Sequence, residues 1–193
     1  MLRMGALFVE EINKSIGENI SIIIGISKYE NISSLPGCVN DVTLMRDLLN
    51  LTNKYHKNLL ISEDTNAVQV KEQLSEFITK QKSNTINEVF FYFIGHGYFD
   101  GNEFRYILSD FEKDKINQTT LSNDYLDNLL RTLNAKFTVK VVDACNSGIP
   151  YIKSANENKY FEDIEKSINN CCFMFSSNSI QPSYQTQLSH FTN

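Results

Sequence analysis

The sequence contains no long apolar run and no block of one charge. None of its apolar stretches approaches the ~20 residues of a membrane-spanning helix, and the N-terminal stretch 1–11 is too brief for a signal peptide. The 18 basic and 23 acidic residues are interspersed, with a net charge of −5. No basic stripe is therefore available to neutralise the phosphates of a nucleic acid. We expect a cytoplasmic protein that contacts neither membrane nor nucleic acid.

Several motifs for cofactors and catalysis are also absent. The four cysteines include no C-x-x-C pair, which argues against a disulfide framework and against a zinc knuckle. The glycines at 95, 97 and 101 miss the G-x-G-x-x-G spacing, and the G-x-S-x-G elbow of serine hydrolases does not occur. There is no internal repeat and no interdomain linker. We expect a single domain over residues 1–193, with a core from about residue 20, no cofactor and no metal centre.

What the sequence does contain is an alternation of short apolar runs with helical patterns. Apolar runs predict strands at 20–27, 57–62, 87–95, 137–144 and 171–177, and EFRYILSD at 103–110 predicts a hairpin at the edge of the sheet. Apolar stripes predict helices over 39–52, 66–82 and 121–133, the first with Val42, Met45, Leu48 and Leu49 on one face. Right-handed crossovers then give an α/β fold, a mostly parallel sheet with helices on both faces.

Two chemically capable side chains follow neighbouring predicted strands. His96 comes just after the third strand, in FFYFIGHGYF, and Cys145 just after the fourth, in KVVDACNSG. Functional groups gather at the carboxyl ends of parallel strands, so we expect the two to meet at one edge. An imidazole beside a thiol takes its proton and later protonates a leaving amine. Taken singly, His96 fits a structural histidine and Cys145 a buried core thiol.

Three motifs in this order resemble those of the caspase-like cysteine peptidases, nearest the metacaspase and bacterial caspase-homologue branch. They are LPGCVNDVTLMRDLL at 35–49, YFIGHG at 92–97 and VVDACNSG at 141–148. Cys145 follows His96 by 49 residues, which agrees with the ~50-residue offset in caspases. The resemblance implies a caspase-like three-layer sandwich from about residue 21 onward. It also implies a cysteine endopeptidase that acts on proteins or peptides.

The resemblance assigns roles to single residues. It makes Cys145 the nucleophile, His96 the general acid and base, and Gly97 with Cys145 the oxyanion hole. Metacaspase-type members cut after Arg or Lys, and the carboxylates that pair with this P1 cation match Asp143 and Asp41. The alternative is that Asp143 caps the following turn and Asp41 caps the first helix.

Other positions refine the expected specificity. Cys38 lies beside Asp41 in the first motif and belongs to the same expected S1 pocket. Leu35 stands near the place where aspartate-specific caspases carry an arginine, so we expect no preference for aspartate. Metacaspases often have a serine two residues before the histidine, where this chain has Ile94. The hydroxyl of that serine is therefore missing from the pocket.

The resemblance also bears on regulation. The polar segment 147–170 matches a loop that commonly controls family members, and Lys153 and Lys159 are suitable P1 residues for self-cleavage in it. A solvated loop is the alternative. A regulatory domain or an activator protein would be the partner, since bacterial relatives often accompany defence or signalling modules. The acidic stretch 110–124 resembles the region where some metacaspases bind activating Ca²⁺, although a solvated loop fits it as well.

Two further expectations concern the chain as a whole. A complete caspase-like fold would continue with another helix and a sixth strand, so we expect a fragment that lacks the last elements. The main alternative to an enzyme is a pseudoprotease, an inactive caspase-like interaction module. A third hypothesis is an inactive piece of a processed enzyme.

Overall fold

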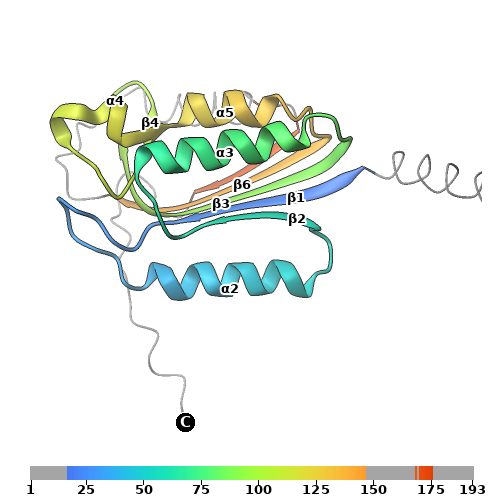
Figure 1. The fold of residues 1–193 in the computed structure, drawn as a ribbon, viewed down its shortest axis with the longest axis horizontal. Helices are drawn as coiled ribbons and strands as arrows, with labels where there is room; N and C mark the ends of the chain where they lie inside the picture. The colour runs from blue at the N-terminus through green and yellow to red at the C-terminus, as the bar shows by residue number, and fades with distance from the viewer. Residues whose placement is uncertain (1–16, 147–167, 169, 176–193) are drawn as a thin grey trace, which may run out of the picture.

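The computed structural model describes residues 17–146, 168 and 170–175, with only the backbone described at positions 145 and 146. Short strands alternate with helices along the chain (Figure 1). The strands are β1 (Glu18–Gly25), β2 (Lys57–Ile61), β3 (Ile86–Phe99), β4 (Phe104–Ile107), β5 (Thr120–Ser122), β6 (Phe137–Asn146) and β7 (Cys171–Phe175). The helices are α2 (Cys38–Leu51), α3 (Ala67–Gln81), the short α4 (Ile116–Thr119) and α5 (Asn123–Arg131), with a 3₁₀ turn at Lys113–Lys115.

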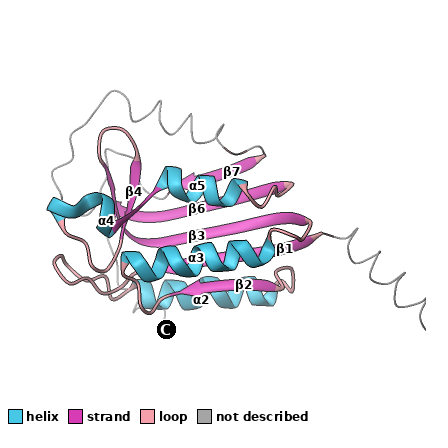
Figure 2. Ribbon diagram, turned by 45° about the horizontal axis from the view of Figure 1, so that its top comes forward, coloured by secondary structure: helices cyan, strands magenta, loops and turns pink. Residues whose placement is uncertain are grey.

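The strands form one mostly parallel sheet. Its parallel part has the order β2-β1-β3-β6-β7, and β4 and β5 continue antiparallel from the far end of β3. Helix α2 covers one face of the sheet, while α3 and α5 lie side by side on the other (Figures 1 and 2). The expected α/β class and three-layer architecture are confirmed.

Burial on both faces explains the composition of the central strands. Ile20, Ile22 and Ile24 are fully buried, and Ile23 between them is 3% exposed. A strand covered by helices on both sides needs apolar residues at consecutive positions rather than at alternate ones. The larger part of the core lies under α3 and α5 and includes Phe91 and Phe93. A smaller cluster lies under α2.

A charged group interrupts the larger core. Lys140 of β6 is completely buried, and its Nζ donates to Asp127 Oδ1 of α5 at 2.5 Å. It also donates to the side-chain oxygen of Asn123, which accepts from the Tyr106 hydroxyl and whose amide donates to Asp127. The lysine lies over the rings of Tyr106 and Phe173. This network joins α5 to the middle of the sheet.

Two predicted helices differ in detail from the structure. Leu121 lies in the short strand β5 rather than in a helix, and α5 begins only at Asn123. The reason is a side-chain cap, because Ser122 is extended and its hydroxyl accepts from the Tyr125 N–H at 3.2 Å. On α2, Val42 and Leu49 are buried as predicted, whereas Leu48 is 49% exposed.

Candidate active site

His96 and Cys145 occupy paired positions on neighbouring parallel strands. The register of β3 and β6 sets Ile94 against Asp143, His96 against Cys145 and Gly97 against Asn146. The prediction placed both residues beyond the strand ends, and this was wrong, because both strands continue. Strand β4 pairs with β3 through Gly97 to Phe99, which keeps the chain extended past His96. The histidine therefore sits in the sheet itself.

One ring nitrogen of His96 is held by the backbone of the loop that follows β1. Nε2 lies 2.8 Å from the carbonyl oxygen of Ser33. A carbonyl only accepts, so Nε2 carries the proton in this contact and donates it. The neutral ring then has its lone pair on Nδ1. The loop thus fixes both the orientation and the tautomer of the imidazole.

The other ring nitrogen is free to act as a base. Nδ1 is buried and has no hydrogen-bond partner among the described residues. Burial lowers the pKa of His96 below its ordinary value, and the hydrogen bond to Ser33 opposes this only in part. A buried, unpaired acceptor costs free energy unless a donor reaches it. At neutral pH, His96 therefore offers a neutral Nδ1 that is suited to taking a proton.

Tyr29 supports the histidine from the same loop. Its hydroxyl accepts a hydrogen bond from the backbone N–H of His96 at 2.8 Å. The two rings lie with their centroids 4.7 Å apart. This approach requires a glycine at position 95, because a Cβ there would come within 2.8 Å of the Tyr29 hydroxyl oxygen. The G-H-G motif thus has a packing reason in addition to a chemical one.

The two predicted aspartates lie near each other on the face that α2 covers. Asp41 is in the first turn of α2, and Asp143 is on β6 beside Ile94. Partial burial raises the pKa of Asp41, and the negative charge of Asp143 raises it further. Neither residue is an N-cap of α2, since Gly37 takes that position. The structure therefore brings together two carboxylates that are 102 residues apart in the sequence.

Tyr92 and Cys38 complete this group. Tyr92 lies in the apolar cluster with Cys38, Val42 and Ile94, and only 5% of it is exposed. Burial raises the pKa of Tyr92, and so do the charges of Asp143, Asp41 and Cys38, in that order. Cys38 opens α2 and is 3% exposed. The two carboxylates therefore lie against an apolar cluster that includes Ile94, the residue two positions before the histidine.

The model of the caspase-domain family matches residues 18–192, from the start of β1 to beyond β7. The chain belongs to the caspase-domain family. A caspase domain indicates a cysteine peptidase, and the paired positions of His96 and Cys145 agree with that class. Comparison with curated proteins gives no match.

Gly97, which the resemblance assigns to the oxyanion hole of this caspase domain, is part of the sheet. It lies between Tyr106 of β4 and Asn146 of β6 in the sheet. A Cβ at this position would come within 2.3 Å of the Phe104 ring and 3.0 Å of the Ala144 Cβ. Glycine is therefore needed for packing, whether or not its N–H binds an oxyanion.

The remaining predicted positions give no assembled site. Lys153 and Lys159 lie outside the described residues. Of the acidic stretch, Asp110 accepts from the Ala67 N–H at the start of α3, and Glu112 pairs with Lys115 at 2.8 Å. Within residues 17–146, 168 and 170–175, no three His, Cys, Asp or Glu side chains converge to hold a metal ion. None of the described helices is long and apolar enough to cross a membrane.

Sequence reasoning missed Ser33 and Tyr29. Ser33 acts through its carbonyl oxygen, so the identity of its side chain carries no signal. Tyr29 precedes His96 by 67 residues and belongs to none of the motifs. Its contribution comes from the loop that brings it against Gly95, and only the folded chain reveals that.

Proposed function

We propose that this caspase domain is a cysteine endopeptidase that cuts after Arg or Lys, with Cys145 as nucleophile and His96 as general base and acid. The observation that carries the proposal is the state of His96. It stands in register with Cys145, its Nε2 is held by Ser33, and its buried Nδ1 lacks a partner among the described residues. That is the arrangement needed to accept the proton of a neighbouring thiol.

The reaction follows from these roles. Nδ1 of His96 takes the thiol proton, and the thiolate of Cys145 attacks the carbonyl carbon of the scissile peptide. The backbone N–H groups of Gly97 and Cys145 stabilise the oxyanion that forms. His96 returns the proton to the amine nitrogen, the C–N bond breaks, and the thioester remains on Cys145. Water, deprotonated by His96, then attacks the thioester and releases the acid.

Specificity for a basic P1 residue rests on Asp143 and Asp41, with Cys38 in the wall. Burial raises the pKa of Asp41, and the negative charge of Asp143 raises it further, so the two carboxylates repel each other. A guanidinium or ammonium between them removes that repulsion and gains charge-assisted hydrogen bonds. Ile94 offers no hydroxyl, so the cation depends on the carboxylates. An acidic P1 residue would add a third negative charge and is disfavoured.

Fluorogenic peptides with Arg, Lys or Asp at P1 test the proposal, with wild type assayed beside Cys145→Ala. We expect hydrolysis of the Arg and Lys peptides by wild type and background rates with the variant. Asp143→Asn should lose cleavage after basic residues, while alkylation of Cys145 by iodoacetamide continues at a similar rate. Equal signals from wild type and Cys145→Ala would instead favour an interaction module without activity. A preference for P1 Asp would refute the assignment of the carboxylates.

Regulation by self-cleavage at Lys153 or Lys159 is part of the same proposal. Both are basic residues in a polar segment, so they match the expected P1 preference. Intact-mass spectrometry of active protein beside Cys145→Ala checks this. A chain that stays whole while it hydrolyses peptides would show that cutting is unnecessary. Repeating the assay with EDTA and with added Ca²⁺ tests whether the acidic stretch 110–124 serves activation.

A further inference from the structure

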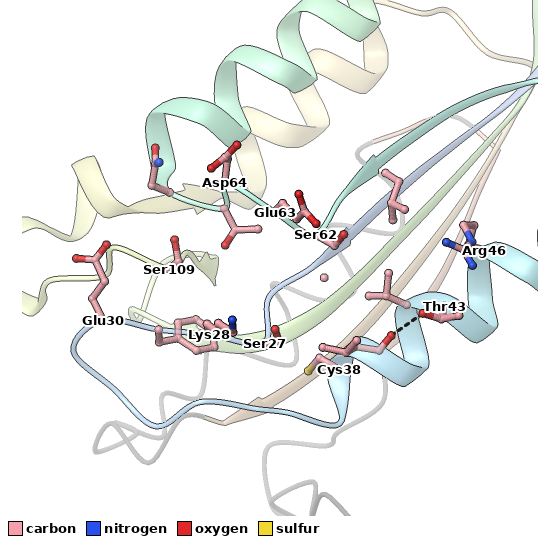
Figure 3. A pocket seen from close by; sticks show the side chains of 17 residues that line it. Ser27, Lys28, Glu30, Cys38, Thr43, Arg46, Ser62, Glu63, Asp64 and Ser109 are labelled. Carbon is pink, nitrogen blue, oxygen red and sulfur yellow. Dashed lines mark hydrogen bonds between the residues drawn. The ribbon is translucent and has the colours of Figure 1, made fainter.

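A cavity of ≈ 680 Å³ lies at the carboxyl ends of β1 and β2, which we call the β1–β2 cavity. Figure 3 shows its walls, with the loop Ser62–Asn66 on one side and the start of α2 on the other. Ser27 and Lys28, just beyond β1, line it as well. His96, Asp41 and Asp143 are not among the residues that line it. Cys38, which the proposed function places in the wall of the S1 pocket, does line it, so that function leaves the rest of the cavity without a role.

The cavity lies one side chain away from His96. Tyr29 lines the cavity, and its ring also packs against the His96 ring at 4.7 Å. In the sheet, β1 and β2 follow β3 on the side opposite to β6. The order across the sheet is therefore Cys145, His96, Tyr29 and then the β1–β2 cavity.

The proposed reaction determines which end of the substrate lies on the side of the β1–β2 cavity. His96 must hand its proton to the nitrogen of the leaving amine, so the primed part of the substrate departs on the side of His96. Neighbouring strands lie about 4.8 Å apart, so the boundary of β1 and β2 is ~10 Å from the boundary of β3 and β6. An extended peptide covers ~3.3 Å per residue and reaches that far with about three residues.

We propose that the β1–β2 cavity is the primed-side subsite that binds residues P2′ and P3′ of the peptide substrate. The proposal rests on the peptidase function above and adds to it a second specificity determinant. It also gives Tyr29 a second role, as the wall that separates the histidine from the primed side chains.

The charges of the cavity select the kind of residue that it binds. Glu63 and Asp64 line it from the β2–α3 loop, and within the described part of the chain no cation pairs with either. Arg46 faces them from α2, but its guanidinium is paired with Asp47 at 2.9 Å. Lys28 and Glu30 also line the cavity and carry one positive and one negative charge. The unbalanced charge is negative, so the cavity prefers Lys or Arg at P2′ or P3′.

Two substrate series with one non-primed sequence and Arg at P1 test this. The first carries an aminocoumarin directly on P1 and has no primed residues. The second consists of internally quenched peptides with Lys-Lys, Ala-Ala or Glu-Glu at P2′–P3′, and mass spectrometry identifies the bond cut. For wild type we expect kcat/KM to fall from Lys-Lys to Ala-Ala to Glu-Glu, by two- to five-fold for each exposed carboxylate engaged.

Glu63→Gln combined with Asp64→Asn should bring the three peptides to similar rates and leave the coumarin substrate unchanged. Glu72→Gln combined with Glu76→Gln removes the same charge from the exposed face of α3 and should leave the preference intact. If both series are cleaved at rates that do not depend on P2′–P3′, or if the cavity variant keeps the dependence, the subsite proposal is overturned. The peptidase function would stand in either case. Failure to cleave the coumarin substrate would instead remove the peptidase function beneath it.

Discussion

The buried pair of Lys140 and Asp127 gives the sharpest test of how this fold is held together. In Asp127→Ala, the Lys140 ammonium loses its counter-charge while it remains fully buried. Asn123 still accepts from it, but a neutral amide does not replace a carboxylate. The perturbation is therefore an unpaired positive charge in the core beneath α5.

Two independent estimates give the same magnitude. Removing one partner of a buried ion pair costs about 3–5 kcal/mol. Alternatively, Lys140 gives up its proton, and at pH 7 this costs about 1.4 kcal/mol for each unit below the ordinary lysine pKa of about 10.4, or about 5 kcal/mol. A domain of this size is stable by only about 5–15 kcal/mol. The variant should therefore be close to unfolding at room temperature.

The pH dependence identifies the cause. Burial already lowers the pKa of Lys140, against the opposing charge of Asp127, and removing Asp127 lowers it further. The unfolded chain then binds a proton that the folded variant lacks, so stability of the variant rises with pH. Its deficit relative to wild type should shrink between pH 7 and pH 9, by up to about 1.4 kcal/mol per unit.

Urea unfolding followed by circular dichroism measures both quantities. Asp124→Ala removes an exposed aspartate in the first turn of the same helix, whose charge acts on Lys140 less than that of Asp127; it serves as the control and should cost under about 1 kcal/mol. Lys140→Met combined with Asp127→Leu should recover most of the loss, because neither charge then remains buried. A loss below about 1 kcal/mol in Asp127→Ala, or a deficit that does not change with pH, would refute the reasoning.

Three further predictions concern the site. Since burial lowers the pKa of His96, the acid limb of a kcat/KM profile should lie below pH 6.5, and a limb above that value would contradict a buried neutral base. Gly97→Ala should cost about 1–3 kcal/mol in thermal or urea unfolding because its Cβ meets the Phe104 ring, and Phe104→Leu should restore part of it. Tyr29→Phe should cost about 1–3 kcal/mol by leaving the His96 N–H unpaired, with an unchanged melting temperature as the contrary result.

Much of the architecture can be predicted from local patterns of apolar residues in the sequence. The isoleucines of β1 and the apolar run of β3 predict central strands, because only a strand covered on both faces needs such runs. Strand β5 has only three residues, and its apolar residue also fits the stripe of a helix. The spacing of apolar residues therefore cannot distinguish a strand from a helix here. The cap at Ser122 decides the question, and its geometry exists only in the folded chain.

The site also has features that the sequence predicts and features that only the folded chain reveals. The places of His96 and Cys145 after successive predicted parallel strands predict the neighbouring positions that the sheet register shows. The contact of His96 with the Ser33 carbonyl could not be predicted, since a backbone oxygen is the same at every residue. The β1–β2 cavity was missed for a related reason. Its walls come from segments 25–30, 38–46 and 60–66 together with Ser109, and although the second lies within the first motif, nothing in the sequence joins it to the others.

The central claim is that His96 activates Cys145 as a nucleophile. The most direct measurement treats the protein with a peptidyl-Arg chloromethyl ketone and maps the adduct by mass spectrometry, in wild type and in His96→Ala. We predict one adduct, on Cys145, which forms about 10²-fold more slowly in the variant, with Cys38, Cys171 and Cys172 unmodified. Labelling of a different cysteine, or labelling of Cys145 at the same rate without His96, would contradict the claim.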